Sequence, residues 1–131
     1  MQLNAETSWL GGFADANGFA MTEATGDRVV LEWDVIAAQH QPYGIVHGGV
    51  YCAAVETAAS VAGALWFGER GKVVGVNNST DFLRAVTDGH LTATATPVHR
   101  GRSQQLWQVM ITDGQDRLVA RGQVRLQNLT D

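Results

Sequence analysis

The sequence predicts an α+β protein in which an antiparallel sheet curls around one long helix. An apolar run of eighteen residues, Val50 to Phe67, predicts the helix, and its small residues allow other backbones to come close. One segment before this run and four after it alternate with period two, as strands do. Because a helix that is apolar on nearly all sides must be covered on nearly all sides, we expect the sheet to enclose it.

The first half of the sequence is expected to form three elements. Residues 1–27 hold Trp9, Leu10, Phe13 and Phe19 among glycines, and we expect a short helix and turn that cover one end of the sheet. The first strand is expected over residues 28–36, where apolar side chains alternate with polar ones. The central helix is expected over 47–67, because Gly48 and Gly49 mark its N-terminal end.

Four further strands are expected after the helix. They cover 72–84, the alternating segment around 91–96, 105–112, and a last strand whose core face is Leu118, Ala120, Gly122, Val124 and Leu126. Pro97 is expected at a strand edge or a bulge. Tight turns are expected at His99 to Arg102 and at Asp113 to Asp116.

Composition bounds the class of protein. A chain of 131 residues with 45% apolar and 17% charged residues is expected to form one domain, 1–131. The net charge of −4 is the wrong sign for a general nucleic-acid binder. The only cysteine, Cys52, cannot pair within the chain, and no Cys/His cluster has zinc spacing, so we expect no metal site. Since no basic segment followed by an apolar run opens the sequence, a cytoplasmic location is expected.

The apolar run also just reaches the length of a membrane span. Glu56 lies near its middle, where a carboxylate is costly in lipid, and most of its other residues are alanine and glycine. We therefore expect a buried core helix and no membrane span.

The segment from Gln41 to Gly49 holds the first candidate chemistry. Pro42 and Gly44 indicate a loop, and Gly48 follows His47 where the helix begins. Unpaired N–H groups and the positive end of the helix dipole at such a position suit a developing oxyanion. The alternative is that the glycines only permit a sharp turn.

Glu56 is the second candidate, as the only charged residue between His47 and Glu69. A carboxylate on a helix that must be buried is either paired, for example with Arg84, or held as a base or nucleophile. Ser60 lies one turn further on the same face, within reach of a water held by Glu56, although its hydroxyl could simply bond back to the helix.

Helix geometry separates these two candidates. Eight residues at a rise of 1.5 Å each place Gly48 and Glu56 about 12 Å apart along the axis, so one carbonyl cannot touch both. If both serve one reaction, they come from two chains related by a two-fold axis. The sequence therefore predicts an obligate homodimer with two composite sites.

These residues resemble the hotdog-fold acyl-CoA thioesterases of the type that hydrolyses phenylacetyl-, hydroxybenzoyl- and dihydroxynaphthoyl-CoA. The resemblance covers about residues 29–127 and is most specific at Gln41, His47-Gly48-Gly49, Glu56 and Ser60. It implies a hotdog fold, dimers joined edge to edge, and often tetramers built as dimers of dimers. No cofactor is implied, because coenzyme A belongs to the substrate and the product.

The resemblance also implies roles for the site residues. Glu56 would attack the thioester carbon or activate water, and the Gly48 amide, with His47 beside it, would polarise the carbonyl. Gln41 and Ser60 would position water or the carboxylate, with Gln41 and Gly48 from one chain and Glu56 and Ser60 from its partner. Coenzyme A contacts would lie at Gly75, at Phe82, Leu83, Arg84 and Ala85, and at His99, Arg100, Gly101, Arg102, Ser103 and Gln104.

Two alternatives remain beside this reading. His40 to Gly44 faintly resembles the motif of hotdog dehydratases that act on hydroxyacyl thioesters, although the spacing to Glu56 is wrong. A non-catalytic acyl-CoA sensor on the same fold would need a reporting domain, which 131 residues do not supply. An aromatic acyl group is expected from the resemblance alone.

Overall fold

The computed structural model describes residues 10–130, and its centre is the helix α2, Gly48–Phe67. Before it come the helix α1, Gly12–Ala16, and the strands β1, Ala20–Ala24, and β2, Val29–Asp34. After it come β3, Gly71–Phe82; β4, His90–Arg100; β5, Gln104–Asp113; and β6, Leu118–Thr130. One-turn 3₁₀ helices, Ala37–Gln39 and Gly68–Arg70, flank α2.

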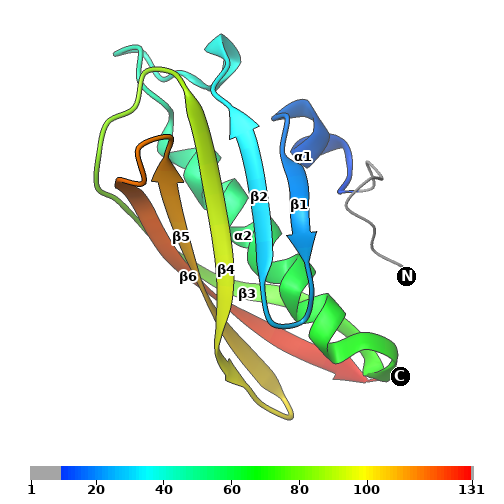
Figure 1. The fold of residues 1–131 in the computed structure, drawn as a ribbon. Coiled ribbons are helices and arrows are strands. Elements are labelled where there is room, and N and C mark those ends of the chain that lie inside the picture. Colours follow the sequence, from blue (N-terminus) through cyan, green and yellow to red (C-terminus); the bar gives the residue numbers. More distant parts are fainter. Residues whose placement is uncertain (1–9, 131) are drawn as a thin grey trace.

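The six strands form one antiparallel sheet in the order β1-β2-β4-β5-β6-β3. The sheet bends around α2, which lies in its concave face (Figure 1). The strand β3 follows the helix in sequence but pairs with β6, the last strand, so β3 forms one edge of the sheet and β1 the other. The predicted curved sheet around one central helix is confirmed.

Alternation along the strands builds the core as expected. Leu91, Ala93 and Ala95 of β4 point inward with Trp107, Val109 and Ile111 of β5, and all six are fully buried. Pro97 lies at a bulge between β4 and β5, as predicted. A second register shift, at Ile111/Thr112, moves the core face of β6: Val119 is buried and Leu118 is exposed, whereas Leu118 was expected inside.

The N-terminal segment is partly different from the prediction. The short helix is present as α1, but Ala20–Ala24 forms the strand β1 where only a turn was expected. Only Met21 of β1 is buried, and three of its five residues are alanine or glutamate, which are depleted in strands, so its pairing with β2 leaves little trace in the sequence. Residues 1–9, including Trp9, lie outside the described part of the chain.

The helix α2 is long and apolar enough to cross a membrane by length and composition, yet here it is the core helix. It contacts every strand of the sheet. One stripe along the helix is accessible to solvent, whereas burial on nearly all sides was expected.

Candidate functional site

The N-terminus of α2 presents one unpaired amide. His47 is its N-cap, and the His47 Nδ1 atom accepts a hydrogen bond from the Gly49 N–H at 2.8 Å. The Val50 N–H donates to the His47 carbonyl at 2.9 Å. Within residues 10–130 the Gly48 N–H has no hydrogen-bond partner, so it is the first-turn donor that a ligand can use.

The loop before α2 is held by its own backbone. The His47 N–H donates to the Gln39 carbonyl at 2.8 Å, and Gly44 N–H donates to the Gln41 carbonyl at 2.9 Å. Gly44 has a φ of 78°, which a glycine adopts without strain. The Gln41 Oε1 accepts from the Tyr43 N–H, so this carboxamide is turned into its own loop. Gln41 and Gly48 therefore lie at the two ends of one ordered segment.

Glu56 lies on the accessible stripe of α2 and is exposed, which corrects the expectation that it is buried. No ion pair within the described residues includes it, and Arg84 is also exposed, so the predicted alternative of a buried pair is not found. Ser60 is half-buried one turn further along the same stripe. The stripe exists because β3 is an edge strand of the sheet and nothing among residues 10–130 covers the helix beyond it.

The strand β3 is fixed against this stripe. Asn78 Nδ2 donates to the carbonyl of Cys52 at 2.9 Å, and the Thr80 hydroxyl donates to Asn78 Oδ1 at 2.7 Å. In an α-helix the Cys52 carbonyl also receives the N–H of Glu56, so Asn78 braces the turn that carries the carboxylate. Neither Asn78 nor Thr80 carried a motif that would have singled it out.

Two aromatic residues crowd the N-terminal end of α2. The Tyr51 and Phe82 rings lie 5.9 Å apart, and Phe82 covers Gly48. The Tyr51 hydroxyl is buried without a partner in the described part of the chain, and burial raises the pKa of Tyr51 to about 12. The sequence offered no signal for Tyr51, since a tyrosine in an apolar helix reads as core.

The predicted coenzyme A residues fall into separate groups on one chain. Phe82, Leu83, Arg84 and Ala85 end or follow β3 near the N-terminus of α2, and all four are exposed. Gly75 lies at a bulge within β3. The segment His99 to Gln104 comprises the end of β4, the turn Gly101 to Ser103 and the start of β5, so the turn begins two residues later than predicted. It lies near the opposite end of α2, about 30 Å away by the length of a twenty-residue helix.

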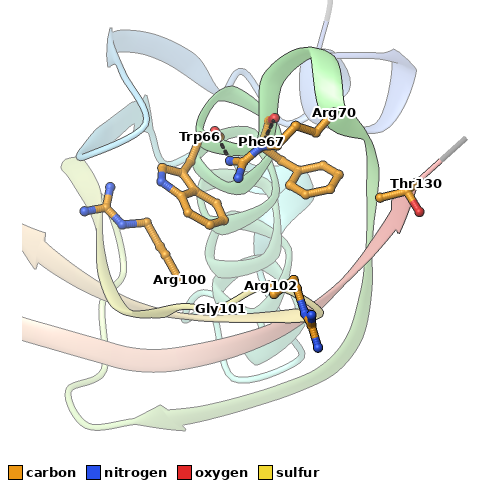
Figure 2. A pocket seen from close by; sticks show the side chains of 7 residues that line it. All are labelled: Trp66, Phe67, Arg70, Arg100, Gly101, Arg102 and Thr130. Carbon is orange, nitrogen blue, oxygen red and sulfur yellow. Dashed lines mark hydrogen bonds between the residues drawn. The ribbon is translucent and has the colours of Figure 1, made fainter.

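A pocket of about 520 Å³ lies beside that turn (Figure 2). It is lined by Trp66, Phe67, Arg70, Arg100, Gly101, Arg102 and Thr130. Arg100 is already engaged: its Nη1 donates to Asp27 at 2.7 Å and to the Gly26 carbonyl at 2.8 Å. Arg70 donates to the carbonyls of Trp66 and Phe67 at the end of α2. Arg102 is exposed and forms no ion pair within residues 10–130.

Trp66, Phe67, Arg70 and Thr130 were not predicted as site residues. Trp66 and Phe67 read as core at the end of an apolar helix, and the pairing of Arg70 with Trp66, 4.4 Å from the ring centre, depends on the chain turning back after Gly68. In the described part of the chain no three His, Cys, Asp or Glu side chains gather as a metal site.

A curved antiparallel sheet around one long central helix is the architecture of the hotdog thioesterases. A model of the thioesterase superfamily matches residues 43–120. The chain belongs to this superfamily, and it is a hydrolase of thioesters.

Three proteins show the extent of the similarity. Rv1847 of Mycobacterium tuberculosis is 55% identical over 115 residues, which are 86% of this chain and 82% of the relative. The proofreading thioesterase EntH of Cronobacter sakazakii is 35% identical over 115 residues, covering 88% and 82%. The crystal structure of AziG from S. sahachiroi, at 53% identity, superposes with a TM-score of 0.91 over 93% of this chain and 99% of AziG.

Proposed function

We propose that the chain hydrolyses the thioester of an acyl-coenzyme A, with an aromatic acyl group, in a site shared by two copies of the chain. The observation that carries the proposal is the accessible stripe of α2: Glu56 is exposed and Ser60 half-buried on a helix that is otherwise mostly core. An exposed stripe of small residues beside a free strand edge supports coverage by a second chain. No cofactor takes part, and the expected location is the cytoplasm.

The edge strand β3 favours this second chain as another copy. Its outward side chains include Val74, 44% exposed, and Val76, 50% exposed, and no strand within residues 10–130 pairs with its outer backbone groups. Two β3 edges paired about a two-fold axis would also bring each stripe of α2 against the partner's loop. The Gly48 N–H of one chain and Glu56 of the other then reach one carbonyl, which the 12 Å separation within one chain forbids.

The chemistry follows from these two groups. The Gly48 N–H, backed by the helix dipole, donates to the thioester oxygen and stabilises the negative charge that develops there. In one route Glu56 removes a proton from the water that attacks the carbonyl carbon, the C–S bond breaks, and that proton passes to the departing thiolate of coenzyme A. In the other route the Glu56 carboxylate attacks the carbon and expels the thiolate, and water then hydrolyses the mixed anhydride, which frees Glu56 and the acid and supplies the proton for the thiol. Ser60 and Gln41 orient the water. The His47 Nδ1 is held by Gly49, so its ring stays beside the oxyanion donor.

The test is thiol release from benzoyl-, phenylacetyl-, dihydroxynaphthoyl- and hexanoyl-CoA by the wild type and by Glu56→Gln. We expect an aromatic thioester to have the highest kcat/KM and Glu56→Gln to lose about 10²- to 10⁴-fold in kcat. Glu69→Gln, a matched change at the far end of the helix, should keep wild-type rates. Faster hydrolysis of hexanoyl-CoA would reject the aromatic assignment, and binding without thiol release would favour an acyl-CoA sensor.

A further inference from the structure

We propose that the buried amides of Gln105 and Asn128 are positioning residues, which hold the β4–β5 turn in the shape that receives the nucleotide end of coenzyme A. This inference rests on the proposed function, because it concerns the carrier half of the same substrate. Neither residue reaches the thioester; both act through the turn Gly101 to Ser103 and its Arg102.

A chain of hydrogen bonds links the two amides to the core. Trp107 Nε1 donates to Gln105 Oε1 at 2.7 Å, and Gln105 Nε2 donates to Asn128 Oδ1 at 2.7 Å. Because an indole nitrogen can only donate, it fixes which way the Gln105 amide points, and Gln105 in turn fixes Asn128. Gln105 is 0% exposed and Asn128 7% exposed, so water does not compete for these hydrogen bonds and the orientation of both amides is fixed.

With its amide oriented in this way, Asn128 presents its Nδ2 donors to the β4–β5 turn. Its Nδ2 donates to the carbonyls of Gly101 and Arg102, both at 3.1 Å, and its backbone N–H donates to the carbonyl of Ser103 at 2.9 Å. Three consecutive carbonyls of an exposed turn are thus tied to one residue. The turn is ordered before any ligand arrives, so binding loses less conformational freedom.

The helix α2 closes the network from the other side. Gln105 Nε2 also donates to the carbonyl of Gly63 at 3.3 Å. A Cβ at position 63 would lie 2.7 Å from Gln105 Oε1 and 2.2 Å from Leu126 Cδ1, so only glycine permits this approach. The turn is therefore anchored to the same helix whose C-terminal end supplies Trp66 and Phe67 to the pocket.

The pocket has the chemistry of a nucleotide phosphate site. Three of the nine basic residues of an acidic chain line it, together with two aromatic rings. Guanidinium groups suit phosphates, and about 520 Å³ lies within the usual range for small-molecule sites. The Arg70 guanidinium lies over both rings, 4.4 Å from the centre of Trp66 and 4.7 Å from that of Phe67. Arg70, Arg100 and Arg102 all line the pocket (Figure 2), but Arg100 and Arg70 already bond to protein groups, so the charge free for a phosphate is that of Arg102. Arg102 lies in the turn that Asn128 holds.

The experiment compares two carriers of one acyl group. For the acyl group that the wild type hydrolyses fastest, kcat and KM are measured on the coenzyme A thioester and on the pantetheine thioester, which lacks the nucleotide. Asn128→Ala should raise KM for the coenzyme A thioester about tenfold with kcat within about twofold, and should leave both constants unchanged for the pantetheine thioester. Ile111→Val, a mild core change at the other end of β5, should show no such split.

Other outcomes overturn the inference. Equal effects of Asn128→Ala on both thioesters, or no effect on either, would reject the positioning role. If Asn128→Ala does not fold, Asn128→Asp keeps the size and the acceptor but removes both side-chain donors, and the same split is required of it. Arg102→Ala must reproduce the split as well. A wild type without preference for coenzyme A over pantetheine would reject the nucleotide pocket but not the thioesterase, whereas a wild type inactive on both would reject the proposed function.

Discussion

The ring of Phe82 lies against Gly48 so closely that a Cβ at position 48 would come within 2.3–2.9 Å of three ring carbons. The end of β3 thus covers the first turn of α2, where the free amide lies. The Phe82 ring can lie in this position only because residue 48 is glycine, whether or not the substrate also requires a glycine there. Phe82 is 55% exposed, so its ring can move aside without opening the core.

Gly48→Ala is therefore expected to displace Phe82 without unfolding the protein. The added methyl group lies where the ring and a thioester oxygen would both approach, so kcat/KM should fall at least about tenfold while the melting temperature changes little. Steady-state kinetics and thermal unfolding check this. In Phe82→Ala the methyl group has room, and adding Gly48→Ala there should cost activity less; an equal loss in both backgrounds would contradict the steric account.

Gly63→Ala is expected to destabilise the fold. Its Cβ would meet Leu126 and Gln105, both fully buried, and overpacking a core typically costs about 1–3 kcal/mol. Urea unfolding measures the loss. Gly12→Ala at the start of α1 meets no atom within 4 Å and should be neutral or slightly stabilising. A Gly63→Ala variant as stable as the wild type would show that the amide network tolerates a shifted helix.

His90 is expected to make stability depend on pH. Its Nε2 lies 2.7 Å from Glu32 and its Nδ1 2.9 Å from Asp34, and these carboxylates raise the pKa of His90, while the hydrogen bond from His90, with help from Thr22, lowers the pKa of Glu32. The stability from His90 is present below its unfolded pKa of about 6.5 and is lost as pH rises through the folded value. The contribution from Glu32 is lost as pH falls through its own lowered pKa.

The advantage of the wild type over His90→Gln should therefore be larger at about pH 5.5 than at about pH 8.5. It should stay below about 1 kcal/mol, since the three side chains are partly or largely exposed. Urea unfolding at both pH values provides the comparison. An advantage that grows toward pH 8.5 would contradict the assigned sign.

The sequence predicted the parts of this fold that follow a strong period. The length of its apolar run predicted the helix α2. Alternation of apolar and polar residues predicted the strands β2, β4, β5 and β6. The strand β1 did not, because a single buried side chain, Met21, carries its inward face. The exposure of Leu118 was missed because Val119 is an extra residue at a bulge in β6, which no residue type signals, and this bulge shifts the register.

The sequence predicted those parts of the candidate site that depend on residue type alone. His47-Gly48-Gly49 and Glu56 stand out as a helix start and a lone charge in an apolar run. The exposure of Glu56 was not predictable, since it depends on β3 pairing with β6 at the edge of the sheet. The pocket at Trp66 was hidden for a similar reason: its arginines come from the β4–β5 turn and from beyond α2, and only the fold brings them together.

The central claim, a site shared between two chains, is tested most directly by mixing two inactive variants. Gly48→Pro removes the amide donor at a position where proline suits a helix. It is combined with Phe82→Ala so that the proline ring has room, and Phe82→Ala alone is the reference. The second variant is Glu56→Gln, made in the same Phe82→Ala background so that both chains match the reference. Co-expression with two different affinity tags yields the mixed dimer.

A mixed dimer holds one site with both groups intact and one with neither. We predict that tandem-purified mixed dimers hydrolyse the best thioester of the panel at about half the rate of the reference, and that a random mixture reaches about a quarter, because half of its dimers are mixed. Each variant alone should stay inactive. Purified mixed dimers with no more activity than the separate variants would contradict a composite site and would require the donor and the carboxylate to act within one chain.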